Sequence, residues 1–472
     1  MSSAMRITGI RLKNYRQFRD FNLDLTDPKT KEPLDKVCFI GSNGTGKTTL
    51  LALIAEFLEA GGHRIPSDLN QMICYQISQG KDEFFILYDH ARNMNWSGDS
   101  SRPYVLSVRI SETNEWKNLW KPQVDHTNDQ KFNNFLIQRN LARRDNDVLE
   151  KFLMSNNASD LAIYASPDGS SLLKSSSSGL PSTNLDKALK LFDNLPAYHE
   201  SSFSRLEAFW NFLIYQIKKR ERDYLQFLDS QDAQNLQVHE AKRQFDLTYP
   251  EILKQLAEQW NLILDQAGLE FDIINAQIPV QLSENLQAFI KLQSSDTQVP
   301  YNLLSTGIRN FIFRFGHIFT LYFNRQIERG FLLLDEPEAS LFPDLLHDII
   351  ARYESIIHNT QFFAATHSPI VAAQFRPEER FILEFDETGA VNWRRGVSPE
   401  GDDPNDLLMN DFGIRSLYRD KGNKEYKRFL SLRQQILITD DKNEKIRLLD
   451  EYAKIGNAYN FPTNDAISTK IN

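Results

Sequence analysis

One short segment restricts the possible folds of this chain more than any other: an apolar run that ends in a glycine-rich loop. The run is Val37–Ile40, and the loop Gly41–Thr48 reads Gly-Ser-Asn-Gly-Thr-Gly-Lys-Thr. A short apolar run before a glycine predicts a buried strand. The residues from Thr48 to Leu58 indicate a helix, which Gly61 and Gly62 are expected to end. The segment therefore predicts strand, loop and helix in the order found in α/β folds.

The loop has the composition that binds phosphate groups. Its glycines let backbone N–H groups turn toward phosphate oxygens, and the following helix directs its positive end at the same anion. Lys47 is expected to reach the β- and γ-phosphates, and the Thr48 hydroxyl is expected to hold Mg²⁺. The predicted nucleotide contacts are Asn43, Gly44, Thr45, Gly46, Lys47, Thr48 and Thr49.

A second apolar run supplies carboxylates. Phe331–Leu334 predicts a central strand, and Asp335 and Glu336 follow at its carboxyl end, where ligands bind in open α/β sheets. We expect Asp335 to contact Mg²⁺, directly or through water, and Glu336 to act as general base on the attacking water. Because most of the chain separates Asp335 from Lys47, a large insertion must lie between the two halves of the site.

Three further motifs indicate the class. Leu304–Gly307 reads L-S-T-G, Glu336–Pro343 reads E-P-E-A-S-L-F-P, and Thr366–Pro369 reads T-H-S-P after a predicted strand. With these motifs the chain resembles the ABC-type ATPases of the group that contains RecF, the SMC proteins and the OLD-family nucleases. The resemblance implies that the ligands are ATP and Mg²⁺. It also implies a homodimer or higher homo-oligomer assembled through the ATP-binding heads, because the signature serine of one subunit contacts the γ-phosphate held by another.

The same resemblance assigns roles to single residues. Ser305 and Gly307 take the signature role, His367 senses the γ-phosphate, and Ser340 and Leu341 form the D-loop at the dimer interface. Two positions depart from the family pattern. Thr306 replaces a commoner glycine, which is expected to weaken closure or slow turnover, and Phe342 stands where the family often has histidine.

The start of the chain also resembles RecF-like proteins. Tyr15–Phe18 is similar to their N-F-R-x-F turn, which implies that Arg16 lies near the nucleotide. The residues equally allow an ordinary turn between strands with Tyr15 and Phe18 in the core. A Q-loop glutamine is not assigned, since Gln76 and Gln79 follow a predicted strand but also suit an exposed surface.

The predicted fold class is α/β: an ABC-type P-loop ATPase head, with a mixed sheet flanked by helices, a helical insertion and a helical C-terminal tail. Residues 1–127 are expected to form the N-terminal ATPase lobe with the P-loop, and 128–290 a mainly helical insertion. Residues 291–395 are expected to form the lobe with the signature, Walker B and switch histidine. Residues 396–472 are expected to form a tail that contacts a partner or another copy. The residue pattern also predicts one helix over Pro343–Ile357.

Composition limits the environment and the partners. The net charge of −9 excludes a globally basic protein that wraps nucleic acid, although a local basic groove stays possible. The two cysteines, Cys38 and Cys74, exclude a disulfide framework and a four-cysteine zinc site. No apolar stretch approaches the roughly 20 residues that span a bilayer, so we expect a cytoplasmic protein without a membrane segment.

The narrower resemblance is to the PtuA ATPases of bacterial Septu and some retron anti-phage systems. It depends on the RecF-like start, the helical insertion and a tail opened by Asp406–Gly413. It implies an ATPase that assembles and regulates a partner nuclease of the HNH type, similar to PtuB, and meets DNA through that complex. No nuclease activity is expected in this chain, because the acids after Pro399 lack the arrangement of a Toprim site. Two alternatives stay open: a PARIS-type AriA-like scaffold that holds a Toprim nuclease, and a RecF-like repair ATPase that binds DNA directly.

Overall fold

The computed structural model describes residues 5–60, 71–80, 82–89, 104–109, 159–166, 198–201, 219–249 without 232, 234 and 235, 251–272, 290–299 without 296, 303–323, 325–414, 416, 418–459 and 461. The chain divides into two compact units, Met1–Pro404 and Asn405–Asn472. Each unit is described by itself below.

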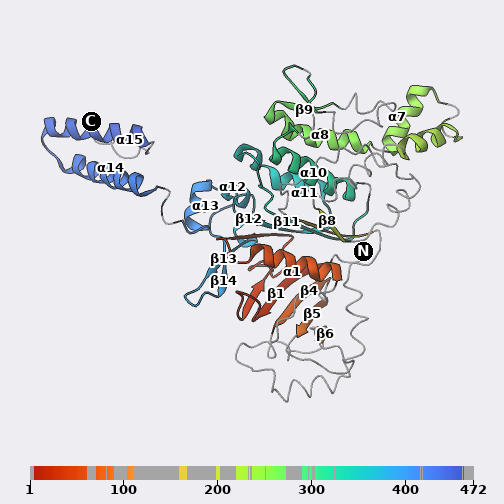
Figure 1. The fold of residues 1–472 in the computed structure, drawn as a ribbon, viewed down its shortest axis with the longest axis horizontal. Helices are drawn as coiled ribbons and strands as arrows, with labels where there is room; N and C mark the ends of the chain where they lie inside the picture. The colour runs from red at the N-terminus through yellow and green to blue at the C-terminus, as the bar shows by residue number, and fades with distance from the viewer. Residues whose placement is uncertain are drawn as a thin grey trace, which may run out of the picture. The chain divides into compact units, whose positions relative to one another are not determined.

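The larger unit is built on a seven-stranded sheet with the order β14-β13-β3-β12-β11-β7-β8 (Figure 1). All neighbouring strands are parallel except the antiparallel pair β13 and β14. The central strands are buried along almost their whole length, as expected for parallel strands covered on both faces. The strands are β3 (Lys36–Gly41), β7 (Asp160–Ala165), β8 (Tyr198–Ser201), β11 (Arg329–Asp335), β12 (Thr360–Thr366), β13 (Arg380–Phe385) and β14 (Val391–Arg395).

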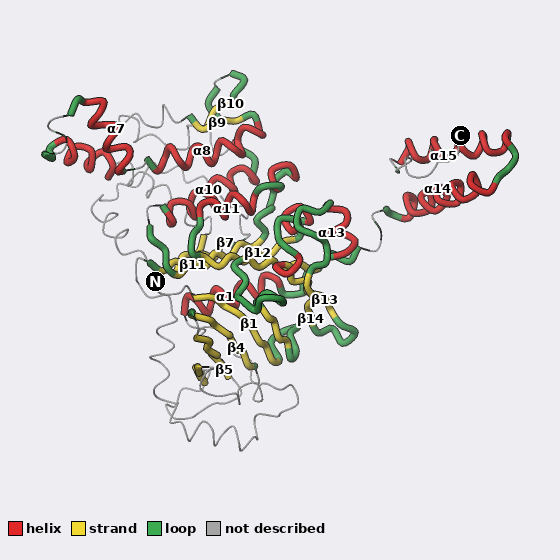
Figure 2. The backbone as a smooth tube through the Cα atoms, turned by 180° about the vertical axis from the view of Figure 1, so that it is seen from behind, coloured by secondary structure: helices red, strands yellow, loops and turns green. Residues whose placement is uncertain are grey.

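A second, antiparallel sheet has the order β2-β1-β4-β5-β6. Helix α1 (Lys47–Ala60) lies between the two sheets (Figures 1 and 2), and one apolar cluster joins all three layers. The buried amide of Gln361 on β12 also links the layers, because it exchanges two hydrogen bonds with the backbone of Ile7 at 2.8 and 2.9 Å. The strands are β1 (Met5–Lys13), β2 (Phe21–Asp24), β4 (Met72–Gln79), β5 (Asp82–Asp89) and β6 (Tyr104–Arg109).

Helices cover the opposite face of the seven-stranded sheet (Figure 1). Helix α10 (Thr306–Tyr322) is buried along most of its length, and α8 (Ile252–Leu264) packs on it through Trp260, whose indole N–H donates to Ile312 O at 3.1 Å. The remaining elements are α7 (Val238–Thr248), the 3-10 turn η4 (Asp265–Ala267), β9 (Leu269–Phe271) paired with β10 (Ile290–Leu292), α12 (Pro369–Ala372) and the 3-10 turn η9 (Pro377–Glu379).

The single helix predicted over Pro343–Ile357 is wrong, because the structure divides it. A 3-10 turn, η8 (Pro343–Leu346), is separated by His347 and Asp348 from α11 (Ile349–Ile356). The amide of Gln374 supports the break: its nitrogen donates to Leu346 O at 2.7 Å and its oxygen accepts from Ile350 N at 3.0 Å. A distant side chain thus satisfies backbone groups that a continuous helix would have paired internally.

Two strands of the main sheet come from within the region expected to be a helical insertion. Strand β7 pairs with β11 over Asp160–Ala165, and β8 pairs with β7. The sheet of the head therefore includes segments from 128–290, which the sequence did not indicate. Residues 128–158, 167–197, 202–218 and 273–289 of the predicted insertion lie outside the described residues.

The smaller unit is helical, as predicted. It contains α13 (Pro404–Asn410), whose first residue lies at the unit boundary, and the helical pair α14 (Asp420–Ile438) and α15 (Lys442–Tyr459). The pair is joined by a small apolar cluster in which the rings of Phe429 and Tyr452 stack with centroids 4.1 Å apart. The mixed seven-stranded sheet, the flanking helices and the helical tail confirm the predicted α/β fold class. Across the helices that the structure describes, none is long and apolar enough to cross a membrane.

Candidate nucleotide site

Three adjacent parallel strands bring the predicted site residues together. Strand β12 pairs with β3 on one side and with β11 on the other. The glycine-rich loop follows β3, His367 follows β12, and Asp335 is the last residue of β11. Because parallel strands end at the same edge of a sheet, motifs that are far apart in the sequence meet at one place.

The glycines of the loop are needed for its shape. Gly44 and Gly46 have φ values of +84° and +96°, which side chains with a Cβ rarely adopt. A Cβ on Gly46 would also lie 2.4 Å from the Phe18 ring. Inside the loop the Thr45 hydroxyl donates to Ser42 O at 2.8 Å. The loop is therefore a compact turn at the start of α1.

Lys47 is held inside this turn. Its ammonium donates to Gly41 O at 2.8 Å and to Ser42 O at 3.2 Å, and the residue is 6% exposed. Burial lowers the pKa of Lys47, and the carboxylates of Asp335 and Glu336 act in the opposite direction. A phosphate group in the loop would bring further negative charge to this buried ammonium and favour its protonated form.

Asp335 is the most buried carboxylate of the site, at 1% exposure. The Thr48 side chain hydrogen bonds to it, while burial raises the pKa of Asp335 to about 6. Its Oδ2 atom has no hydrogen-bond partner among the residues that the structure describes. A buried carboxylate oxygen beside a hydroxyl is the donor set that Mg²⁺ uses when substrate phosphates and water complete its shell. Within the described ranges, no group of three or more His, Cys, Asp or Glu is placed to hold a metal by itself.

Glu336 and His367 face each other, with Oε1 and Nε2 4.0 Å apart. Glu336 has a φ of +47°, which a residue with a side chain adopts only when its surroundings impose it. Buried Arg314 of α10 supplies that support by donating to Asp335 O at 3.3 Å and Glu336 O at 3.1 Å. The pKa of His367 lies below its usual value, first because of partial burial and then because of the charge on Lys47, while Glu336 acts in the opposite direction.

The signature residues begin α10. The Ser305 side chain caps the helix by accepting from Ile308 N at 3.4 Å, and Ser305 is exposed. Gly307 lies directly against the D-loop, since a Cβ there would be 1.9 Å from Ser340 O. Thr306 is exposed, so the glycine that this packing requires is Gly307, and a threonine fits at 306.

A cavity of about 1060 Å³ opens beside the signature. Ser305 and Ile308 line it together with the D-loop residues Ser340 and Leu341 and with Phe342, which is 67% exposed. None of the residues of the glycine-rich loop lines this cavity. The signature and the phosphate loop of one chain therefore do not line the same cavity.

The turn at Tyr15–Phe18 has the predicted core packing, while the place of Arg16 near a nucleotide stays a prediction. Tyr15 and Phe18 are buried, and the turn packs on the phosphate loop, where the Gln17 amide donates to Gly44 O at 3.1 Å. Arg16 is exposed, with its guanidinium 5.6 Å from the centroid of the Tyr15 ring. The contact to the loop is thus made by Gln17. Gln76 lies within β4 rather than after it, and Gln79 is the last residue of that strand.

Sequence reasoning missed three residues of the site. These are Gln17 at the phosphate loop, Arg314 at the backbone of the acidic turn, and Glu338, which binds the T-H-S-P segment. Gln17 and Glu338 lie inside motifs that the sequence displays, but nothing in the motifs shows which groups they contact. Arg314 carried one signal: a charged residue between two phenylalanines, Phe313 and Phe315.

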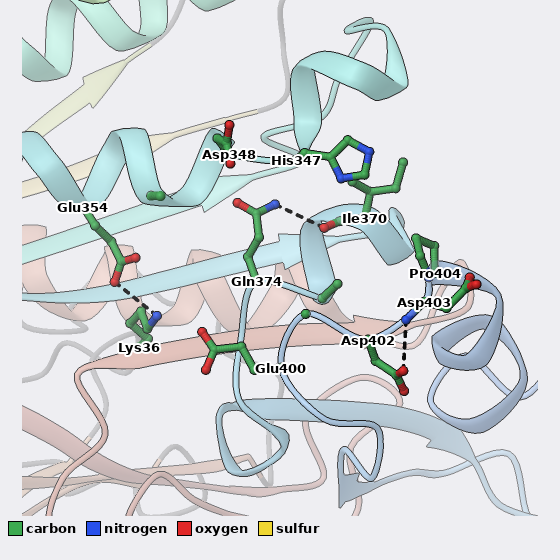
Figure 3. A pocket seen from close by; sticks show the side chains of 13 residues that line it. Lys36, His347, Asp348, Glu354, Ile370, Gln374, Glu400, Asp402, Asp403 and Pro404 are labelled. Carbon is green, nitrogen blue, oxygen red and sulfur yellow. Dashed lines mark hydrogen bonds and ion pairs between the residues drawn. The ribbon is translucent and has the colours of Figure 1, made fainter.

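A second cavity, of about 530 Å³, contains none of the predicted site residues (Figure 3). It is lined by the turn before α11, by α12 and by the segment that precedes Pro404. Lys36 pairs there with Glu354 at 3.2 Å, and the Gln374 amide donates to Ile370 O at 3.1 Å. Three of its polar side chains, Lys36, Glu354 and Gln374, are thus paired within the protein.

The fold and the site define a P-loop ATPase head of the ABC-like type, with both nucleotide-binding halves on one sheet. A family model described as "AAA ATPase domain" (AAA_15) matches residues 5–372. Because that match covers most of the chain, the chain belongs to the AAA ATPase domain family.

Solved structures of SMC heads are also similar to the chain. One is the Smc head domain with an extended coiled coil from Pyrococcus furiosus, bound to the C-terminal domain of ScpA. It has 10% identity, a TM-score of 0.40, and 83% of this chain and 96% of that chain covered. Another is the SMC head domain from Thermotoga maritima, with 11% identity, a TM-score of 0.38, and 83% and 100% covered.

Proposed function

We propose that this ATPase binds ATP with Mg²⁺ in the Gly41–Thr48 loop and hydrolyses it with Glu336 as general base. The observation that carries the proposal is the convergence of Lys47, Asp335 and His367 at the ends of three adjacent strands. Each of the three has a pKa displaced by burial and by charged neighbours, as is common for groups gathered in a functional site.

Each residue of the site has its own role in the proposed reaction. Thr48 and Asp335 would hold Mg²⁺, which when bound neutralises charge on the phosphate oxygens. The Glu336 carboxylate accepts a proton from the attacking water, and its left-handed backbone fixes the direction of its side chain. His367, whose pKa is lowered in the chain alone, would donate one ring N–H toward the γ-phosphate.

A second copy of the chain would complete the site. The exposed Ser305 caps the start of a long helix, whose N-terminus favours an anion. Its cavity holds no residue of its own phosphate loop, so the anion would be the γ-phosphate of ATP bound by another copy. The D-loop residues Ser340 and Leu341 would meet the partner at the same interface.

Equilibrium ATP binding and steady-state hydrolysis test the proposal. Lys47→Ala should weaken ATP binding by ~10- to 100-fold, because a charged hydrogen bond to phosphate is lost. Glu336→Gln should keep ATP affinity within about threefold while kcat falls by ~10²-fold or more. Lys36→Ala, at the opposite end of β3, is the matched control and should change neither. ATP affinity that survives Lys47→Ala unchanged would contradict the assignment.

We further propose that ATP state regulates a partner nuclease of the HNH type in anti-phage defence. The support is the PtuA-like motif content and a separate helical unit with exposed apolar residues near the α14–α15 turn, Leu437, Ile438 and Ile446. Replacing these three with Asp should abolish co-purification of a co-expressed HNH partner and leave ATP hydrolysis unchanged. A co-purifying Toprim protein would favour the AriA-like alternative. Tight, salt-dependent DNA binding by the chain alone would favour the RecF-like one.

A further inference from the structure

Glu338, the second acid of the E-P-E turn, binds the segment that carries the switch histidine. Its Oε1 atom accepts from the backbone N of His367 at 2.7 Å and from the Thr366 hydroxyl, also at 2.7 Å. The Thr366 hydroxyl in turn accepts from Ser368 N at 2.9 Å. One carboxylate oxygen therefore fixes the backbone on which the imidazole of His367 is carried.

The contact is made in a buried setting. Thr366 is fully buried, and burial raises the pKa of Glu338 although the hydrogen bonds from His367 and Thr366 favour its ionised form. Its second oxygen, Oε2, has no hydrogen-bond partner in the part of the chain that the structure describes. A carboxylate placed here costs solvation energy, and its position is explained by the two hydrogen bonds at Oε1.

The other side of Glu338 is the D-loop. Leu341 N donates to Glu338 O at 3.0 Å, and Ser340 has a φ of +62°, so the turn is tightly folded. Gly307 of the signature lies against the Ser340 carbonyl with no room for a Cβ. Contacts therefore run without a gap from His367 through Glu338 and Ser340 to the start of α10.

We propose that Glu338 is a positioning residue that ties the switch histidine to the D-loop, so that the two move as one unit. The inference rests on the function proposed above. His367 senses ATP held by its own chain, whereas the D-loop and Ser305 meet ATP held by the second copy. Through Glu338, the presence of a γ-phosphate in one site would adjust the surface that completes the other.

The test compares Glu338→Ala with Glu338→Gln in the full chain. Glu338→Ala should lower kcat by ~10- to 100-fold, as for misplacement of a catalytic group, while KM and ATP affinity stay within about threefold. Glu338→Gln should keep most of kcat, because its amide oxygen can accept both hydrogen bonds. Glu328→Ala, exposed at the opposite end of β11, is the matched control and should behave as the wild type.

A double-mutant cycle with His367→Ala separates positioning from general loss of structure. If Glu338 acts through His367, adding Glu338→Ala to His367→Ala should lower kcat by less than about twofold. If the double variant lowers kcat by the product of the two separate factors, or if Glu338→Ala has the wild-type kcat, the inference is overturned. Either result leaves the ATPase assignment intact. If Glu338→Ala does not fold, Thr366→Val removes one of the two donors and must lower kcat without raising KM. Wild-type protein that does not hydrolyse ATP would overturn both proposals.

Discussion

The phosphate loop, Gly41–Thr48, and the acidic turn, Asp335–Ser340, end strands of the same sheet but are held in different ways. The loop takes much of its shape from its own residues, since Gly44 and Gly46 have positive φ values and Lys47 and Thr45 bind carbonyls of the loop, while Gln17 adds one contact from outside. The turn has two positive φ values at residues that are not glycine, Glu336 and Ser340.

That strained turn depends on contacts from elsewhere in the chain. Arg314 binds the backbone at its start, Glu338 joins it to His367, and Gly307 packs against Ser340. From this difference we expect the two halves of the site to have different roles. We expect a loop shaped mainly by its own residues to bind phosphate tightly, and a turn held by several elements to change shape when one of them moves.

The largest effect is expected from a substitution in the phosphate loop. Gly46→Ala forces a Cβ into a left-handed residue against Phe18, so ATP affinity should fall by ~100-fold or more. Gly401→Ala is the matched control, since Gly401 also has a positive φ of +74° but an added Cβ meets nothing within 4 Å. Isothermal titration with ATP measures both. A Gly46→Ala chain that binds ATP normally would show that the loop is not the phosphate site.

The next effect concerns the turn. Arg314→Met removes hydrogen bonds to Asp335 O, Glu336 O and Ser166 O, so unfolding free energy should fall by ~2–4 kcal/mol. Hydrolysis should fall by ~10- to 100-fold because Glu336 is no longer held, while ATP affinity changes little. Denaturant unfolding and steady-state kinetics measure the two effects, with the exposed Arg222→Met as control. Equal losses of binding and hydrolysis would mean that loop and turn are not separable.

The third effect is a pH dependence of stability. Burial raises the pKa of Asp335 to about 6, so in the absence of ligands the folded state favours the protonated carboxyl. The Asp335 carboxyl therefore stabilises the folded state fully below the unfolded pKa, which is near 4. This contribution is lost as the pH rises toward 6, and the free energy of unfolding falls by up to ~3 kcal/mol. Asp335→Asn should thus be more stabilising at pH 7.5 than at pH 4.5. Thermal unfolding at the two pH values, without Mg²⁺ or ATP, checks the sign.

The phosphate loop was predictable from the sequence, and the acidic turn only in part. The glycines of the motif Gly41–Thr48 predict its turn. The apolar strand before Asp335 predicts that this carboxylate lies at the carboxyl end of the strand. Nothing local indicates that Glu338 reaches His367 or that Gln17 reaches Gly44, because those contacts depend on how strands distant in sequence pair. The place of Arg16 near the nucleotide, implied by the resemblance, stays a prediction, and its neighbour Gln17 contacts the loop.

Two strands of the sheet were missed for physical reasons. Strand β7 reads Asp-Leu-Ala-Ile-Tyr-Ala, and the five residues after Asp160 show no alternation, so periodicity cannot distinguish them from part of a helix. Strand β8 reads Tyr-His-Glu-Ser, and only its parallel pairing with β7 makes it a strand. The helix break before α11 was likewise invisible, because Gln374, which supports it, follows 24 residues after Ile350.

The central claim is that the phosphate loop of one copy works with the acidic turn of the same copy and the signature of another. The direct test mixes two inactive chains, Lys47→Ala and Ser305→Arg, and measures ATP hydrolysis. Random pairing gives heterodimers in which one site has an intact loop and faces an intact signature, so mixing should restore about a quarter of the wild-type rate. Hydrolysis that stays at the level of the separate variants would contradict the account.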